Sequence, residues 1–198
     1  MITTVSPSSN NPELVEQAKA GDKHAYVEFV EHFERRVFRI AKQITMNDQD
    51  AEEVLIETFL KAYSALDDFQ ESETLWVWLV AVAAKESLRK VRDRSEASTT
   101  RDDAESELEV ILQEVVRWPV NFQEEYSQEE TICILESAMR SLDPLHRAIF
   151  VLRDIEELSI EDTARALGVS LPLAKRRLLR ARLGLGATLT RHLRQKRG

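Results

Sequence analysis

The chain has 198 residues, of which 43% are hydrophobic, and a formal net charge of −8 at pH 7. This length allows one or two domains with real cores, and the absence of any run of about 18 apolar residues argues against a membrane span. The polar start lacks an apolar run of signal-peptide length, so we expect a cytoplasmic protein. Cys133 is the single cysteine, which excludes an internal disulfide and a cysteine-based zinc site.

Charge is segregated along the chain. Residues 163–198 carry ten basic side chains and no acidic one, whereas residues 93–130 carry three basic and twelve acidic side chains. The negative total argues against a general nucleic-acid coat. The C-terminal segment, which has no carboxylate, is nevertheless a localised positive region that can bind a polyanion.

The pattern of apolar residues predicts an all-α fold made of two small helical domains joined by an acidic linker. Residues 1–11 are expected to be disordered, residues 12–94 form the first domain and residues 131–198 the second. The linker, residues 95–130, carries an amphipathic stripe over residues 108–116. That stripe predicts one short helix, which docks either on the chain itself or on a partner.

Four helices are predicted in the first domain, over residues 12–20, 23–45, 48–66 and 72–94. The second carries an inward stripe that repeats nearly every fourth residue: Ala25, Phe29, Phe33, Val37, Ile40 and Ile44. In the third, the inner face leaves Asp50, Glu53, Glu57 and Lys61 for solvent or a partner.

The fourth predicted helix changes character along its length. Its first half is apolar, and in its second half Lys85, Arg89 and Arg92 recur at i, i+4 and i+7 as a basic stripe. Trp78 repeats with the apolar residues and is expected in the core. Trp76 is either a stacking platform for a nucleic-acid base or a further core residue.

The second domain repeats one apolar pattern three times, starting at Leu135, Leu145 and Ile160, before a basic helix. Residues 158–182 then predict a helix-turn-helix. A capping pair at its start is followed by Gly168, which ends the first helix because glycine adopts the left-handed conformation without steric cost. Ser170 is positioned to cap the second helix.

The second helix of this motif has a small inner face and a basic outer face. The inner residues are Leu171, Ala174, Leu178 and Ala181. Arg176 and Arg180 point away from them, and Lys175, Arg177 and Arg182 flank them. A helical hairpin with a solvated basic face is the simpler interpretation. The order of features along the sequence favours instead a motif that binds in the major groove of DNA. That order is an N-cap, a glycine, an apolar residue in the turn, a second N-cap and a basic helix.

No motif for catalysis or for a cofactor occurs in the sequence. It lacks a glycine-rich phosphate loop, HExxH, paired Cys or His at metal spacing, and G-x-S-x-G. The histidines, His24, His32, His146 and His192, form no local ligand pair. We therefore expect no catalytic residue, no metal site, no cofactor and no enzymatic activity.

Both halves resemble bacterial RNA polymerase sigma factors of the sigma-70 family, in the small two-domain extracytoplasmic-function (ECF) group. Residues 14–92 resemble region 2 through LVEQAKAGD, DAEEVLIETFLKAY and WLVAVA. Residues 131–190 resemble region 4 through LDPLHRAIFVLRDIEELSIEDTARALGVS and AKRRLLRAR. The presence of both regions in this order, across an acidic linker, makes the resemblance specific.

The resemblance implies a factor that binds core RNA polymerase and promoter DNA for transcription initiation, with an anti-sigma factor as a further candidate partner. It assigns polymerase binding to Asp50, Glu53, Ile56 and Glu57. It assigns the melted −10 strand to Trp76, Lys85, Arg89, Lys90 and Arg92. It assigns the −35 major groove to Ser170, Lys175, Arg176, Arg177, Arg180 and Arg182.

Several positions depart from the family's pattern. A common glutamine is Ile56 here, which puts an apolar residue on the surface that would face the polymerase clamp. In the fourth helix, Ala81 stands where the family commonly has arginine, Lys85 where it has asparagine and Arg89 where it has aspartate. In the basic helix, Arg176 stands in place of a common serine and Leu179 in place of a common histidine. Promoter sequences therefore do not carry over from the family.

Two other functions remain open from the sequence. A free-standing helix-turn-helix regulator would use residues 12–92 for dimerisation or sensing. A polymerase-binding protein of sigma shape that no longer supports initiation would explain the altered −10 strip. An enzyme has the least support.

Overall fold

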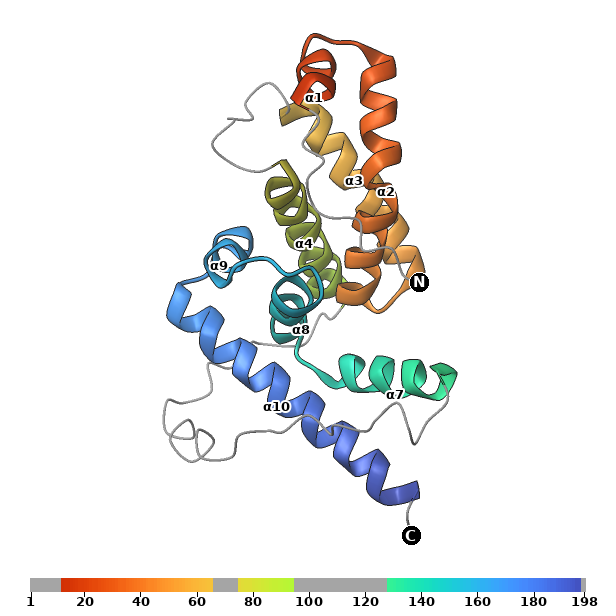
Figure 1. Ribbon diagram of the computed structural model, residues 1–198, viewed down its shortest axis with the longest axis vertical. Helices are drawn as coiled ribbons and strands as arrows, with labels where there is room; N and C mark the ends of the chain where they lie inside the picture. The colour runs from red at the N-terminus through yellow and green to blue at the C-terminus, as the bar shows by residue number, and fades with distance from the viewer. Residues whose placement is uncertain (1–11, 66–74, 95–127, 197–198) are drawn as a thin grey trace. The chain divides into compact units, whose positions relative to one another are not determined.

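The computed structural model describes residues 12–65, 75–94 and 128–196, and these residues are helical apart from short connections (Figure 1). This confirms the predicted all-α fold. The elements are α1 (Pro12–Lys19), α2 (Lys23–Thr45), α3 (Asp48–Ala65), α4 (Leu75–Arg94), α7 (Gln128–Ser141), α8 (Pro144–Phe150), a π-helix (Val151–Ile155), α9 (Ile160–Leu167) and α10 (Leu171–Lys196). No helix in the described part of the chain is long and apolar enough to cross a membrane.

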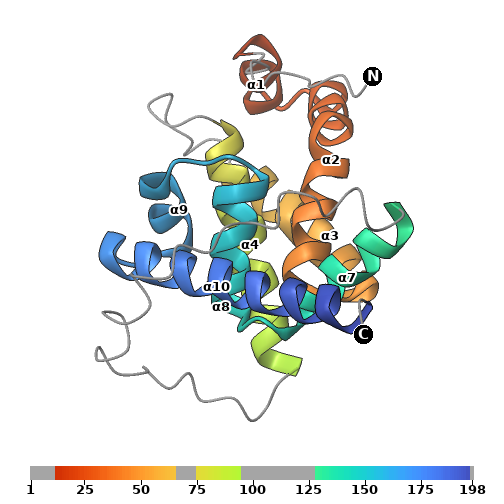
Figure 2. The same cartoon turned by 60° about the horizontal axis from the view of Figure 1, so that its bottom comes forward.

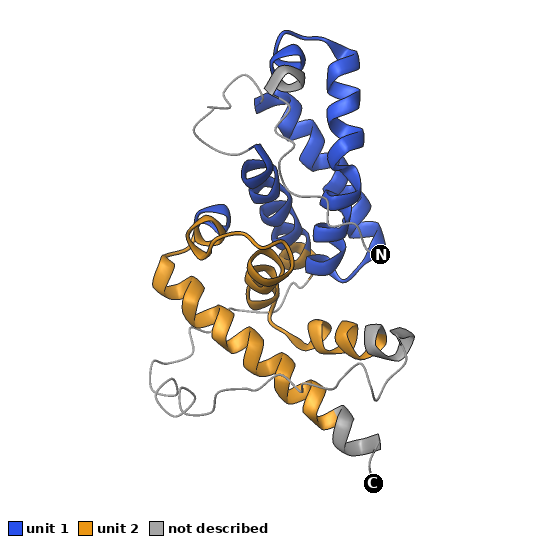
Figure 3. Ribbon diagram, viewed as in Figure 1, with its two compact units in different colours: residues 1–90, 165–168 blue, residues 91–164, 169–198 orange. Residues whose placement is uncertain are grey.

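The chain divides into two compact units (Figure 3). Unit 1 comprises Met1–Lys90 and Arg165–Gly168, and unit 2 comprises Val91–Ala164 and Val169–Gly198. The expected disorder of residues 1–11 and the expected linker helix lie outside the described residues. Those two expectations and the predicted domain boundaries stay predictions.

Helix α2 is central to unit 1 because its apolar residues share one side. All six residues of the predicted stripe are buried. Asp22 caps the helix by accepting hydrogen bonds from the amides of His24 and Ala25, at 2.8 and 3.4 Å. Met46, in the left-handed conformation (φ 54°), ends it and donates its amide to the carbonyl of Lys42.

Aromatic rings join α2 to its neighbours. The Tyr26 hydroxyl donates a hydrogen bond to the Phe59 carbonyl on α3, and burial raises the pKa of Tyr26 to about 12. The Phe29 ring lies 6.0 Å from that of Phe59 and 5.2 Å from that of Phe33. Figures 1 and 2 show α2 and α3 side by side, and buried Leu79 adds α4 to the same cluster. This core determines which faces α3 and α4 leave outward.

Unit 2 is organised around α10, which packs against α7 and α8 (Figure 2). Ala174, Leu178 and Ala181 are buried, as predicted. Asp143 caps α8 through the amides of the next turn. One expectation was wrong: Leu135 of α7 was assigned to an inward stripe but is 39% exposed.

Helix α10 continues unbroken through Gly184 to Lys196. Glycine in a helix costs about 1 kcal/mol relative to alanine. Burial of Leu185 and Leu189 offsets that cost. A Cβ added at Gly184 would lie 3.0 Å from Leu142 Cδ2, so the missing side chain permits a close approach of α10 to the end of α7.

Candidate nucleic-acid interface

Side-chain caps hold both helices of the predicted helix-turn-helix. At the start of α9, the Asp162 amide donates to Ser159 Oγ at 2.9 Å, and the Ser159 hydroxyl donates to the Asp162 carboxylate at 2.6 Å. At the start of α10, the Leu173 amide donates to Ser170 Oγ at 3.4 Å. Both caps agree with the sequence prediction, and the Ser170 residue is exposed.

The turn between the helices is a complete Schellman motif. Gly168 has a φ of +67° and donates its amide to the Arg165 carbonyl at 3.1 Å. The Val169 amide donates to the Ala164 carbonyl at 3.0 Å. The left-handed glycine predicted at this position is therefore confirmed, and the direction in which α10 leaves the turn depends on it.

Three cations of α10 lie on its outer side or beside it. Lys175 is exposed, and Arg176 and Arg180 are half-buried on the side opposite buried Ala174 and Ala181. Among the described residues, none of these three cations forms an ion pair. As far as the described residues go, an external anion can therefore pair with these charges.

Arg177 and Arg182 lie instead against carboxylates of unit 2. Arg182 binds Asp154 of the π-helix through two hydrogen bonds, from Nε at 2.8 Å and Nη2 at 2.7 Å, and these bonds raise the pKa of Arg182. Arg177 Nη1 lies 3.6 Å from Oδ1 of Asp143, the residue that also caps α8. These two arginines therefore fix α10 on its own domain. Sequence reasoning missed this role because it could not predict the π-helix that carries Asp154.

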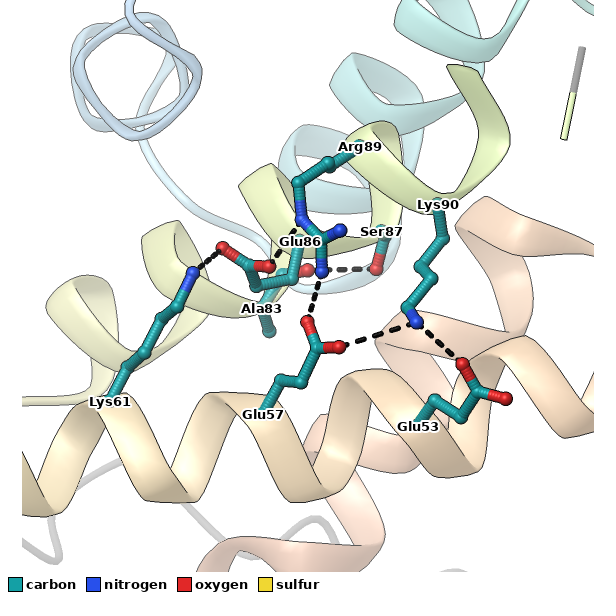
Figure 4. A network of polar contacts seen from close by, with 8 residues as sticks. All are labelled: Glu53, Glu57, Lys61, Ala83, Glu86, Ser87, Arg89 and Lys90. Carbon is teal, nitrogen blue, oxygen red and sulfur yellow. Dashed lines mark hydrogen bonds and ion pairs between the residues drawn. The ribbon is translucent and has the colours of Figure 1, made fainter. Parts of the chain in front are cut away.

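In unit 1, the predicted basic strip of α4 meets the predicted acidic face of α3. We call the six residues involved the α3–α4 ion-pair network: Glu53, Glu57 and Lys61 on α3, and Glu86, Arg89 and Lys90 on α4 (Figure 4). Arg89 donates to Glu57 and, from Nε, to Glu86 at 2.9 Å. Lys90 donates to Glu53 and lies 3.2 Å from Glu57. Lys61 donates to Glu86.

The network shifts the titration of its members. Hydrogen bonds with Glu86 and then Glu57 raise the pKa of Arg89, and the hydrogen bond with Glu53 raises the pKa of Lys90. The same bond with Lys90 lowers the pKa of Glu53. Burial alone would raise the pKa of Glu86, but hydrogen bonds from Lys61 and Arg89 outweigh it and leave that pKa below its ordinary value.

The outward face of α3 also carries an apolar stripe. Ile56, Leu60 and Tyr63 recur at i, i+4 and i+7 and are 60%, 63% and 54% exposed. Ile56 was predicted here, and Leu60 and Tyr63 were missed. Their spacing on the side opposite the inner residues was the available signal. Asp50, also predicted for this face, is half-buried in the first turn and donates its amide to Asn47 Oδ1 at 2.9 Å.

The remaining residues predicted for the −10 strand differ in exposure. Lys85 and Arg92 are exposed on α4. The Trp76 ring stacks on Phe33, with centroids 5.8 Å apart and planes 16° apart, and the guanidinium carbon of Arg36 lies 3.7 Å from its centroid. Trp76 thus borders the core, and stacking of a base on it would require one of these contacts to move.

Comparisons with known proteins agree with the two halves. Residues 29–97 match the family model "Sigma-70 region 2", and residues 134–185 match "Sigma-70, region 4". The chain is 29% identical over 194 residues to ECF RNA polymerase sigma factor SigE of Mycolicibacterium smegmatis, covering 95% of this chain and 72% of that protein. It is 29% identical over 180 residues to ECF RNA polymerase sigma factor SigM of Mycobacterium tuberculosis, covering 91% and 85%.

Two solved structures share the fold. CnrH, in complex with the cytosolic domain of CnrY, has a TM-score of 0.61 and 24% identity, covering 90% of this chain and 96% of that chain. Sigma factor RpoE of Bartonella quintana, in complex with the anti-sigma factor NepR, has a TM-score of 0.58 and 18% identity, covering 83% and 96%. With region 2 and region 4 matched in order and ECF sigma factors as relatives along most of its length, the chain belongs to the sigma-70 family of RNA polymerase sigma factors, in the ECF group.

Proposed function

We propose that this chain binds core RNA polymerase in the cytoplasm and directs promoter recognition, with no catalysis of its own. The observation that carries the proposal is the outer side of α10. There Lys175, Arg176 and Arg180 stand without ion-pair partners among the described residues. Such donors on the second helix of a helix-turn-helix contact phosphates and base edges in a major groove, here that of the −35 element. Ser170, at the start of the same helix, adds an exposed hydroxyl.

The two arginines that bind Asp143 and Asp154 have a different role in this proposal. Arg177 and Arg182 position α10, and any contact they make with DNA is to the phosphate backbone at the edge of the groove. Bidentate pairing of Arg182 with Asp154 fixes both the distance and the rotation of the helix at that point.

Polymerase binding belongs to the outward face of α3 in this proposal. The apolar stripe at Ile56, Leu60 and Tyr63, with Glu53 and Glu57 beside it, offers a partner both apolar area and charge. The α4 strip then meets the melted −10 strand, first through exposed Lys85 and Arg92. A solved relative is bound to an anti-sigma factor, which supports an antagonist of that class as a further partner of this chain.

A reconstituted transcription assay tests the proposal. The purified protein is added to bacterial core polymerase with a genomic promoter library, and specific transcripts are counted. Arg176→Ala or Arg180→Ala should lower promoter-dependent output at least about fivefold, since a lost base contact costs about 1–3 kcal/mol. Core affinity should not change. Arg191→Ala, which removes an exposed charge further along α10, is the matched control and should have little effect.

Glu57→Lys should have the reverse effect, weakening core affinity while leaving the −35 contact intact. If the wild-type protein with core polymerase gives no specific transcript, the initiation role is lost. Loss of core binding in Arg176→Ala would mean that α10 faces the enzyme. Tight, specific DNA binding without polymerase would favour a free-standing regulator.

A further inference from the structure

The α3–α4 ion-pair network joins two surfaces that the proposed function assigns to different partners. Glu53 and Glu57 belong to the face proposed for polymerase, and Arg89 and Lys90 belong to the strip proposed for the −10 strand. In the structure these carboxylates and cations bind one another (Figure 4). A DNA phosphate that approaches Arg89 or Lys90 must therefore compete with a carboxylate that is already there.

We propose that Glu53 and Glu57 form an intramolecular gate on the DNA-binding strip. In the free protein they occupy Arg89 and Lys90, and a partner that engages the two carboxylates frees both cations for single-stranded DNA. This inference rests on the proposed function, because it uses the polymerase face and the −10 strip as defined there.

The geometry of Arg89 suits such a gate. Its Nε is held by Glu86, three residues earlier on the same helix, at 2.9 Å, and the Glu86 side chain is only 9% exposed. Its Nη2 binds Glu57 across the helix pair. Opening the Glu57 contact therefore releases Nη2 from that carboxylate while Glu86 still anchors the guanidinium on α4. Glu86 is a fixed anchor, whereas Glu57 is the part that can be displaced.

Lys90 requires both gate carboxylates to move. Its Nζ binds Glu53 and lies 3.2 Å from Glu57, and its side chain is only 18% exposed. The gate side chains are more accessible, with Glu53 46% and Glu57 31% exposed. A polymerase surface can thus reach the carboxylates without first displacing the lysine.

The strength of the pairs is in the range that a partner can overcome. Ion pairs that are partly exposed contribute little each, because water and salt screen them, so they hold the cations without locking them. Carboxylate and phosphate oxygens accept the same charge-assisted hydrogen bonds. The coupling is reciprocal: a partner on the carboxylates favours DNA on the cations, and DNA on the cations favours that partner by the same factor.

Binding of a fluorescent oligothymidylate to the free, full-length protein tests the gate. Oligothymidylate has a single-stranded backbone and no promoter sequence. The double variant Glu53→Gln with Glu57→Gln, which we call the gate variant, should bind the oligonucleotide about tenfold more tightly than wild type does. The reason is that three partly exposed ion pairs no longer oppose binding. Two added phosphate contacts should also steepen the dependence of log affinity on log salt by about 1.4.

The matched control removes two carboxylates elsewhere. Glu28→Gln with Glu52→Gln changes the net charge equally, at exposed positions outside the network, and should leave affinity within about twofold of wild type. Adding Arg89→Gln and Lys90→Gln to the gate variant should abolish its gain. Circular dichroism checks that each variant is helical. If the double variant unfolds, Glu57→Asp, which keeps the charge but shortens the side chain, should give a smaller gain in the same direction.

Equal affinities of the gate and control variants would overturn the gate, and so would weaker binding by the gate variant. A gain that survives removal of Arg89 and Lys90 would overturn it as well. Failure of the proposed function has a different signature, because it shows as the absence of specific transcripts from the wild-type protein with core polymerase. The Arg176→Ala result there does not depend on the network.

Discussion

Replacing Gly168 by alanine should destabilise the helix-turn-helix by about 1 kcal/mol. The residue has a φ of +67°, and a Cβ placed there would meet nothing within 4 Å, so the cost is confined to the backbone. An L-residue in the left-handed region costs about 1–2 kcal/mol. About 0.4–1 kcal/mol of this cost is offset, because alanine has less conformational entropy than glycine in the unfolded chain.

Native-state hydrogen exchange measures this destabilisation at individual backbone amides. We choose a local measurement because the chain has two compact units, and its global unfolding need not be two-state. The amides of Gly168 and Val169 close the turn, and both should exchange about fivefold faster in Gly168→Ala. Gly168→Asn should lose less, because asparagine tolerates the left-handed conformation better than alanine does.

A second glycine provides the matched control. Gly21, with a φ of +85° and open space around its Cβ position, closes the same motif at the end of α1. Gly21→Ala should speed exchange at that turn by a similar factor and leave the amide of Val169 unchanged. Unaltered exchange at Gly168→Ala would refute the assigned conformation and, with it, the account of how α10 leaves the turn.

Two further predictions concern the ion pairs. Asp154→Asn keeps one acceptor for Arg182 but loses the charge and the second hydrogen bond. Thermal unfolding should therefore show that unit 2 is less stable by about 1 kcal/mol, and promoter affinity should fall several-fold. The control Glu161→Gln, at an exposed position of α9, should change neither quantity. Because the pKa values of Glu53 and Glu86 lie below their ordinary value of 4.5 in the folded state, their pairs stabilise unit 1 above that pH, and this stabilisation is lost as the pH falls through the folded-state values. The midpoint of thermal unfolding should therefore fall more steeply with acidification in the wild type than in Glu86→Gln, and parallel curves would contradict this assignment.

Features that depend on neighbouring residues in the sequence were predictable. The capping pair at Ser159 and Asp162, the left-handed Gly168 and the buried stripe of α2 each follow from spacing within one turn or one helix, and all three are present. The fold class follows in turn, because helices with one apolar face must pack against one another.

Features that depend on the register between helices were not predictable. Arg89 and Arg182 count only as positive charges in a sequence, and whether they meet a carboxylate depends on how α4 faces α3 and on where the π-helix places Asp154. The exposed Leu60 and Tyr63 were missed for a related reason, because apolar residues are assigned to the core by default. The roles of the site residues toward DNA and polymerase remain proposals.

The apolar stripe of α3 also bears on how long a copy of the protein survives. Ile56, Leu60 and Tyr63 are exposed along one side of folded α3, and a partner that recognises this arrangement and does not bind the unfolded chain would stabilise the folded state. Such a partner at a hundred times its dissociation constant adds about 2.7 kcal/mol to the free energy of unfolding. Copies in excess of their partner would then open more often and be degraded first, so turnover would keep the pool of this factor matched to the supply of its partner.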